Sequence, residues 1–216
     1  MNDLAGKKIG ILGGSFDPIH KGHLSIGEAA YRDFALDEVW FIPAGHSPNK
    51  DENQMTPSEY RARMTELAIA PYPYFKMSRI EIDAAETSYT YRTLTKLKEQ
   101  YPDTTFYFIM GADSLDYFEE WMHPEIISKK AVLLVAVRSQ WDRTDIMRKI
   151  AIIEHMFRAE IYPLSCERFD AASREIRQAF EQGDETSSEL PAAVMDFIRE
   201  KHLYIGNNPP EEQRWN

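Results

Sequence analysis

Short apolar runs alternate with longer amphipathic stretches along nearly the whole chain. The runs that we interpret as strands are residues 7–12, 38–44, 75–83, 104–111, 129–137 and 159–164. The stretches with helical patterning are residues 22–35, 57–70, 90–101, 143–157, 173–183 and 191–202. Strands that alternate with helices build a mostly parallel sheet with helices on both faces, so the sequence predicts a doubly wound α/β fold.

The length of the chain fits a single large domain. With 216 residues, it can bury roughly 70% of the surface that its unfolded form exposes, so it needs no disulfides or structural metal ions to be stable. We predict one domain over residues 1–206, which includes a C-terminal helical part from about residue 170. Residues 207–216 are polar, and we expect a mobile tail there.

The charge of the chain argues against one class of partner. The net charge is −10, from 25 basic and 35 acidic residues. A protein that coats nucleic acid needs a net basic face, so we expect no nucleic-acid partner. A small anionic substrate stays compatible with this charge, because it needs only a local basic pocket.

The sequence contains no pattern typical of a membrane or secreted protein. No run approaches the ~20 apolar residues of a membrane span. The first apolar run is too short for a secretory signal and is followed at once by glycines. The single cysteine, Cys166, rules out a disulfide within the chain and fits a reducing compartment. We therefore expect a cytoplasmic protein without a membrane partner, in which Cys166 is a passive thiol.

A polar, turn-rich segment over residues 45–57 follows the second predicted strand, and we interpret it as a loop. At its end, Thr56 precedes Pro57, and Glu59 follows three residues after Thr56. This pattern is typical of a helix start in which Thr56 is the N-cap, Pro57 takes the first helical position and Glu59 completes a capping box.

The stretch GGSFDPIHKGH, residues 13–23, lies where the first predicted strand gives way to the first helix. In an open parallel sheet, ligands bind at the carboxyl ends of strands, where helix N-termini present their amide groups. Gly13 and Gly14 let the backbone approach a phosphate without a Cβ in the way. The stretch matches neither G-x-G-x-x-G nor G-x-x-x-x-G-K-[ST], which disfavours a hydride-transfer dinucleotide fold and a Walker A loop.

His20 and His23 stand three residues apart at the start of that helix, so we expect their side chains to project toward the same region. Two imidazoles beside a helix N-terminus can donate several hydrogen bonds to phosphate oxygens. Two other interpretations stay open on the pattern alone. One is local capping or packing; the other is a metal pair, although H-E-x-x-H is absent and no cysteine is near.

These residues resemble the signature of the nucleotidyltransferase superfamily, whose H-x-G-H motif binds a nucleotide triphosphate. The longer form with S-F-D-P-I-H is similar to the nicotinate/nicotinamide mononucleotide adenylyltransferases, and an ordered set of further motifs resembles the bacterial nicotinate enzymes of that family. Those motifs are SPNK (47–50), TSYTYRTL (87–94), FIMGADSL (108–115) with Trp121, SREIR (173–177) and LPAAVMDFIREKHLY (190–204). The resemblance implies a Rossmann-like nucleotidyltransferase fold over nearly the whole chain.

The resemblance also implies a reaction. The adenylyl group of ATP is transferred to nicotinate mononucleotide, which gives deamido-NAD and pyrophosphate in NAD biosynthesis. The phosphate of the mononucleotide attacks the α-phosphorus of ATP in line, and since it is already an anion, neither a general base nor a covalent intermediate is expected. Mg²⁺ is expected with ATP, held mainly by the phosphates and not by protein side chains. The oligomeric state, including a homo-oligomer, is left open.

On the ATP side, the resemblance implies that His23 is the main catalytic residue at the α-phosphate and that His20 assists at the β- and γ-phosphates. The implied ATP-binding residues are Gly13, Gly14, Ser15, Phe16, His20, His23, Lys50, Ser173 and Arg177. From the residues alone, Lys50 also fits a solvated loop lysine, and Ser173 with Arg177 also fits an N-cap and a surface arginine.

On the acceptor side, the implied nicotinate mononucleotide-binding residues are Ser15, Phe16, Tyr89, Thr90, Gly111, Asp113, Trp121 and Arg138. Trp121 would stack on the pyridine ring. A helix N-terminus at Tyr89 and Thr90 would favour a carboxylate over an amide, and hence nicotinate over nicotinamide. Asp113 would accept hydrogen bonds from ribose hydroxyls, cap the helix that begins there, or do both.

The chain departs from the family pattern at Ala172 and Arg174, where serine and threonine are expected, and at Arg92, where an acidic residue is expected. Either Arg174 replaces the lost hydroxyl donors or ATP binds less tightly. Arg92 either adds positive charge near an acidic substrate or points to solvent. Two alternative functions stay open: another H-x-G-H adenylyl- or cytidylyltransferase, and a nucleotide-binding sensor that has lost catalysis.

Overall fold

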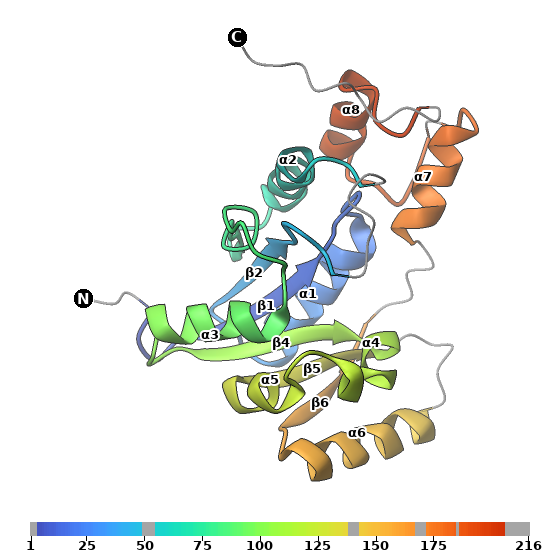
Figure 1. Ribbon diagram of the computed structural model, residues 1–216. Coiled ribbons are helices and arrows are strands. Elements are labelled where there is room, and N and C mark those ends of the chain that lie inside the picture. The colour runs from blue at the N-terminus through green and yellow to red at the C-terminus, as the bar shows by residue number, and fades with distance from the viewer. Residues whose placement is uncertain (1–3, 49–54, 138–142, 167–171, 185, 206–216) are drawn as a thin grey trace.

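A parallel sheet of six strands forms the centre of the molecule, in the order β3-β2-β1-β4-β5-β6 (Figure 1). The computed structural model describes residues 4–48, 55–137, 143–166, 172–184 and 186–205. The strands are β1 (Lys8–Gly14), β2 (Glu38–Pro43), β3 (Phe75–Met77), β4 (Thr105–Gly111), β5 (Ala131–Val137) and β6 (Ile161–Ser165). All five neighbouring pairs of these strands are parallel, so the predicted doubly wound α/β fold is confirmed and its sheet is more regular than expected.

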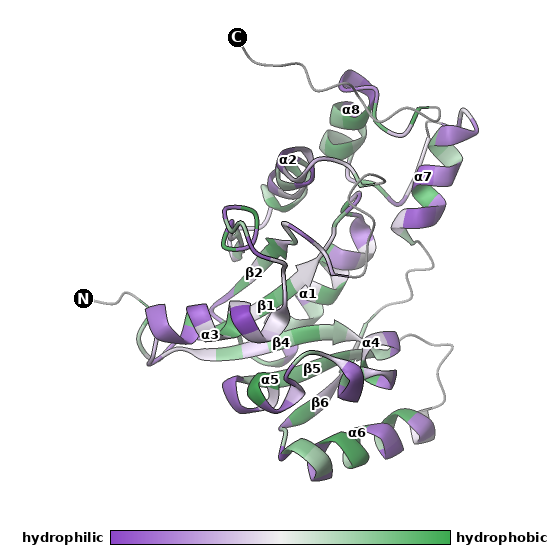
Figure 2. Ribbon diagram, viewed as in Figure 1, coloured by the Kyte–Doolittle hydropathy of each residue, from purple (hydrophilic) through white to green (hydrophobic). Residues whose placement is uncertain are grey.

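Strand side chains alternate between two hydrophobic clusters, one on each face of the sheet. In β1, Leu12 belongs to one cluster and Ile11 to the other; in β5, Leu134 is divided from Leu133 and Val135 in the same way. Successive side chains of a strand point to opposite faces, so each strand contributes to both clusters. The strands are therefore largely green in Figure 2, whereas the helices carry both colours, as expected for a sheet that is covered on both sides.

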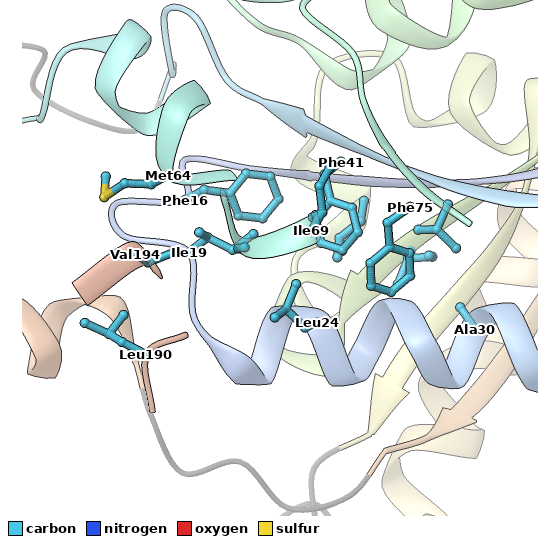
Figure 3. Packing of buried hydrophobic residues seen from close by; sticks show 14 of the residues in the cluster. Phe16, Ile19, Leu24, Ala30, Phe41, Met64, Ile69, Phe75, Leu190 and Val194 are labelled. Carbon is cyan, nitrogen blue, oxygen red and sulfur yellow. The ribbon is translucent and has the colours of Figure 1, made fainter. Parts of the chain in front are cut away.

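Four helices supply buried side chains to the cluster of Leu12 and Leu134. They are α1 (Lys21–Asp33), α2 (Ser58–Ile69), α7 (Ser173–Glu181) and α8 (Ala192–Glu200). In Figure 3, Phe16 of the turn before α1 points into the same cluster as Met64 of α2 and Val194 of α8. The C-terminal helices thus share a core with the N-terminal half, and the single domain over residues 1–206 stays a prediction.

The other face is covered by the helices that follow β3, β4 and β5 along the chain. They are α3 (Thr90–Gln100), α4 (Ala112–Asp116), α5 (Pro124–Lys130) and α6 (Arg143–Phe157), with a short 3₁₀ helix, η2 (Phe118–Glu120). Each α-helix supplies buried side chains to the second cluster, for example Leu94 of α3, Leu115 of α4 and Ile150 of α6. α1 and α2 thus pack on one face of the sheet and α3 to α6 on the other, which is the doubly wound arrangement.

The prediction of a strand over residues 75–83 is wrong beyond Met77. The chain leaves the edge of the sheet there and forms turns, in which the N–H of Asp83 donates to the carbonyl of Arg79 (2.9 Å). The Arg79 guanidinium also pairs with the carboxylates of Asp83 and Glu59. A segment with alternating polarity forms a strand only where a neighbouring strand can pair with it. Beyond Met77 these local contacts form instead of strand pairing.

The start of α2 also differs from the prediction. Pro57 is the N-cap, with φ −48° and ψ 141°, and the helix begins one residue later, at Ser58. Thr56 is engaged elsewhere, because its N–H donates to the Asp17 carboxylate (3.3 Å) and its carbonyl accepts from Arg61 (2.9 Å). The long-range hydrogen bond to Asp17 therefore positions Thr56, and Pro57, not Thr56, is the N-cap.

The helix expected at Asp113 is α4, which begins one residue earlier, at Ala112. The short helix α5 is absent from the prediction, and β5 begins at Ala131 instead of residue 129. The sequence does carry a signal for α5. Pro124 takes the first helical position, Glu125 lies in the first turn, and Lys129 and Lys130 lie in the last, each favourable to the helix dipole.

The C-terminal segment is fastened to the turn that follows β1. The Tyr204 hydroxyl donates to the Asp17 carboxylate (2.7 Å), and Arg177 of α7 donates to the Asp17 carbonyl (2.5 Å). Asp17 is only 4% exposed, so it depends on these partners for its hydrogen bonds. Burial, with Asp17 alongside, holds the pKa of the Tyr204 hydroxyl well above its ordinary value, so it stays a donor.

We expect Tyr204→Phe to lower the free energy of unfolding by about 1–3 kcal/mol, because it removes a donor from a buried carboxylate. Urea denaturation would measure this loss. Tyr162→Phe is the matched control: that hydroxyl donates to Glu160 on the surface (2.9 Å), and its removal should cost less than about 0.5 kcal/mol. Equal losses in the two variants would contradict the role given to the Tyr204–Asp17 contact.

Candidate active site

A pocket of about 400 Å³ opens at the carboxyl ends of β1, β2 and β4. The chain runs from β1 to β2 and β3 on one side of β1 and then crosses to β4 on the other side, so the strand order reverses at this place. Ligands of open α/β sheets bind at such switch points. The residues that line the pocket are Ile11, Gly13, Gly14, Ser15, Ile42, Ala44, Ser47, Pro48, Glu81, Ser88, Tyr89, Thr90, Thr93, Leu94, Phe108, Tyr117, Glu120, Trp121, Met122 and Ile127.

The two glycines at the end of β1, Gly13 and Gly14, differ in what a side chain at each position would contact. Gly13 is exposed, and a Cβ added there would meet only Phe108, at 4.0 Å. At Gly14, a Cβ would lie 3.0 Å from the Phe16 ring. Internal packing therefore explains the absence of a side chain at Gly14, whereas the space in front of Gly13 stays open to a ligand.

Phe16 turns its side chain inward. It has a left-handed backbone, with φ 48°, and its ring is 1% exposed, packed against Phe41 and against the edge of His23. Sequence reasoning placed Phe16 between the two substrates, but only its backbone is available to them. Its ring serves instead to support His23.

His20 and His23 lie together at the N-terminus of α1, as the spacing predicts. His20 is the N-cap, and the two rings are 3.8 Å apart, centre to centre. The N–H of His20 donates to Nδ1 of His23 (3.3 Å), so in the neutral ring Nε2 of His23 carries the proton. His20 is 5% exposed and His23 is more open, which makes His23 the imidazole that can reach a ligand. No acidic residue lies in the first turn of α1, so its dipole favours an anion there.

A buried cation that sequence reasoning missed lies behind the turn. Arg61 of α2 is 1% exposed and donates to the carbonyls of Ser15 (2.7 Å) and Gly45 (3.3 Å). Burial lowers the pKa of its guanidinium, and the charge of Asp17 opposes that shift. The residue was hidden in the sequence because arginines are common on helix surfaces and only the fold puts this one inside.

The aromatic end of the pocket contains three of the predicted acceptor residues, Tyr89, Thr90 and Trp121. Trp121 is partly exposed and contacts the ring of Phe118 at 5.5 Å between centres, so one part of the indole is supported while another borders the pocket. Tyr89 is the N-cap of α3 and Thr90 its first residue. The N–H of Tyr89 donates to Thr87 (3.1 Å), whereas the first-turn amides from Thr90 onward point toward the N-terminal end of the helix.

A hydrogen-bonded group under the same pocket was also missed. The Thr93 hydroxyl donates to the Glu81 carboxylate (2.6 Å), and Ser88 accepts from the N–H of Gly45 (3.1 Å). Burial raises the pKa of the Glu81 carboxyl, and hydrogen bonds from Thr93 and Ser88 oppose that shift. Gly45 fits only without a side chain, because its Cβ would lie 2.2 Å from the carbonyl oxygen of Glu81. These contacts join the loop after β2 to the segment before α3.

Ser173 and Arg177 reach the turn after β1 but bind its carbonyls. The Ser173 hydroxyl donates to Pro18 (2.9 Å), and Arg177 donates to Asp17 (2.5 Å). Ala172 is the N-cap of α7, so Ser173 is its first residue and not its cap. Arg174 is exposed, one residue beyond Ser173. The structure thus brings both predicted residues next to the signature, outside the lining of the pocket.

Arg92 lies on the surface above the aromatic end of the pocket. Its guanidinium stands 5.4 Å from the centre of the Tyr89 ring and 5.7 Å from that of Tyr91, and it approaches the Glu86 carboxylate at 3.8 Å. Of the two interpretations, the structure therefore places its charge on the tyrosines at the rim and not in the pocket.

The other predicted residues fall into two groups. Gly111 ends β4 and is the N-cap of α4, and Asp113 lies exposed in the first turn of that helix, so Asp113 is not its N-cap. Both stand at the carboxyl end of β4 without lining the pocket. Lys50 and Arg138 lie outside the described residues.

Three further findings concern chemistry and surroundings. Burial raises the pKa of the Cys166 thiol to about 11, which supports the prediction of a passive thiol. Among the described residues, no group of three or more His, Cys, Asp or Glu side chains is placed to hold a metal ion. In the same part of the chain, no helix is long and apolar enough to cross a membrane.

The wholly parallel sheet, the glycine turn and the imidazole-bearing helix define a nucleotide-binding α/β protein built to receive phosphate groups. A family model described as cytidylyltransferase-like matches residues 11–179. A relative from Lachnoclostridium phytofermentans, described as a probable nicotinate-nucleotide adenylyltransferase, is 36% identical over 92% of this chain and all of its own length. One of the same description from Clostridium botulinum, strain Okra, is 38% identical over 90% of this chain and 97% of its own.

Solved structures agree on the fold. The Plasmodium falciparum nicotinic acid mononucleotide adenylyltransferase complexed with APC has a TM-score of 0.73 at 21% identity, over 92% of this chain and 97% of that one. The same enzyme complexed with NaAD has a TM-score of 0.70. The chain belongs to the cytidylyltransferase-like family and, within it, to the nicotinate-nucleotide adenylyltransferases. The predicted family and the class of enzyme, a nucleotidyltransferase, are confirmed.

We expect Gly13→Ala to leave the stability of the fold within about 1 kcal/mol and to weaken binding of an ATP analogue at least about tenfold, since its new methyl occupies space that is open only to a ligand. Thermal unfolding and calorimetric titration would measure the two effects. Gly10→Ala, on the same strand, should show the opposite pattern, because its Cβ would lie 2.9 Å from buried Leu36. Unchanged binding in Gly13→Ala would contradict the assignment of this space to the nucleotide.

Proposed function

We propose that this pocket and the adjoining N-terminus of α1 transfer the adenylyl group of ATP to nicotinate mononucleotide, giving deamido-NAD and pyrophosphate in NAD biosynthesis. The observation that carries the proposal is that one short segment lines an aromatic pocket with Gly13, Gly14 and Ser15 and then leads into the imidazole-bearing N-terminus of α1. A pyridine ring fits the first and phosphates fit the second, and the turn between them is where the two substrates would be joined.

The chemistry asks the protein for position and charge. The mononucleotide phosphate is an anion and attacks the α-phosphorus of ATP in line, so no general base is required. The Nε2–H of His23 is the donor for the α-phosphate region, because Nδ1 is already bound by the His20 N–H. A donor fixed in this way stabilises charge on the phosphorane oxygens and on the departing pyrophosphate without reorganising.

At the other end of the pocket, Trp121 would stack on the pyridine ring and the first-turn amides of α3 would meet its carboxylate. The partial positive charge of a helix N-terminus favours an acid over a neutral amide. The glycines and Ser15 would line the junction of the two substrates, with Asp113 near the ribose hydroxyls at the carboxyl end of β4.

Mg²⁺ belongs to this proposal as the companion of ATP. Phosphate oxygens and water would supply most of its ligands. The bound ion would neutralise charge on the leaving pyrophosphate. Lys50, Ser173 and Arg177 are proposed to complete the ATP site and Arg138 the acceptor site. The expected partners are these two substrates, without nucleic acid, in the cytoplasm.

Purified protein with ATP, Mg²⁺ and nicotinate mononucleotide should release pyrophosphate, and nicotinamide mononucleotide should support at least about tenfold less release, because it lacks the charge that the α3 N-terminus favours. A coupled pyrophosphate assay measures both. Equal use of the two acceptors would remove the carboxylate argument. No release from folded protein with either acceptor would leave the nucleotide-binding sensor as the better account.

His23→Ala should lower kcat by about 100- to 1000-fold with a small effect on the KM for nicotinate mononucleotide, because the lost donor acts on the transition state. His155→Ala on exposed α6 is the matched control and should keep wild-type turnover. A His23→Ala enzyme that turns over normally would reject the assignment of the α1 N-terminus to the reacting phosphate.

A further inference from the structure

Arg61 is a fully buried arginine whose guanidinium is hydrogen-bonded to backbone carbonyls and not to a carboxylate. It is 1% exposed and is among the largest fully buried side chains of the described residues. Its guanidinium donates three hydrogen bonds to backbone carbonyls: Nη1 to Ser15 (2.7 Å), Nε to Thr56 (2.9 Å) and Nη2 to Gly45 (3.3 Å). The Asp17 carboxylate is a nearby countercharge and accepts hydrogen bonds from the Thr56 N–H and the Tyr204 hydroxyl.

These carbonyls belong to three separate segments of the chain. Ser15 follows β1, Gly45 follows β2, and Thr56 precedes α2, which carries Arg61 itself. Ser15 lines the pocket, and so do Ala44, directly before Gly45, and Ser47, two residues after it. One planar guanidinium therefore fixes the relative positions of the two loops between which the substrates would meet.

The geometry of the peptide group extends this effect to the ligand side. In a planar trans peptide, the carbonyl and the following N–H point in opposite directions. Since the Ser15 carbonyl points to the Arg61 guanidinium, the N–H of Phe16 points away from it. Ser15 itself lines the pocket. A carbonyl that is polarised by a cation also makes its own N–H a better donor.

We propose that Arg61 is a positioning residue for adenylyl transfer: it orients the Ser15–Phe16 peptide toward the reacting phosphates and sets the spacing between the loops after β1 and β2. The inference rests on the proposed function of the pocket. Stability alone gives a weak reason for this residue, because replacing buried charges by apolar groups of similar size is often neutral or stabilising. The positive charge also lies directly behind the turn, where it favours an anionic ligand.

The test compares Arg61→Lys and Arg61→Met with the wild-type enzyme, after thermal unfolding has shown that each variant is folded at the assay temperature. We expect kcat for pyrophosphate release to fall about 100-fold in Arg61→Met and about tenfold in Arg61→Lys. Lysine keeps the positive charge but lacks the planar guanidinium that donates to several carbonyls at once. The KM for nicotinate mononucleotide should stay within about threefold, because Trp121 and the α3 N-terminus are untouched. If Arg61→Met does not fold, Arg61→Lys carries the test.

Arg63→Met is the matched control. Arg63 lies on the exposed side of α2 and pairs with the Glu66 carboxylate, so its loss removes an arginine of the same helix at a position that does not line the pocket. It should keep wild-type kcat. A folded Arg61→Lys enzyme with wild-type kcat, or a loss confined to KM, would overturn the positioning role.

A second readout separates this inference from the proposed function. Calorimetric titration with Mg²⁺ and a non-hydrolysable ATP analogue should give a Kd raised about tenfold in Arg61→Met. The wild-type protein could bind the analogue in this titration and yet release no pyrophosphate from ATP in the turnover assay. In that case the proposed function fails, and the comparison of Kd values still decides the role of Arg61. If the variants bind as tightly as the wild type, the inference about Arg61 fails.

Discussion

The parallel pairing of β1 with β4 is the constraint on which the rest of this molecule depends. β1 also pairs with β2, so β1 lies between the strands that the chain adds on one side, β2 and β3, and those that it adds on the other, β4 to β6. The connections after β1 and after β4 cover opposite faces of the sheet, and a pocket stays open between them. The glycine turn, the N-terminus of α1 and the segment before α3 all reach this one place because the strand order reverses at it.

An acidic chain can serve anionic substrates because its positive charge is placed locally. Behind the turn after β1, two arginines donate to backbone carbonyls, Arg61 to Ser15 and Arg177 to Asp17. The N-terminus of α1 adds its dipole and lacks acidic residues in its first turn. The net charge of −10 therefore describes the outer surface and says little about the field at the site.

The fold was predictable where a local pattern and its tertiary setting agree. Alternating strands and helices gave the doubly wound sheet, and a resemblance gave the family. The errors at Thr56 and beyond Met77 have different causes. The distant Asp17 carboxylate accepts from the Thr56 N–H, whereas beyond Met77 no neighbouring strand is present and local contacts of Arg79 form turns. Likewise, the Phe16 ring packs inward because the left-handed turn aims it at the core.

By itself, the sequence determined the fold class through its alternating strands and helices, and it determined the family of enzyme through an ordered set of motifs that resembles that family. Tertiary structure alone decided how the groups of the site are held. Nothing local marks Arg61 as buried, Glu81 as the acceptor from Thr93, or Tyr204 as the partner of Asp17. Each of these contacts joins residues that are far apart in the chain or on different elements, and burial converts ordinary polar side chains into fixed supports because an unpaired polar group inside the protein is costly.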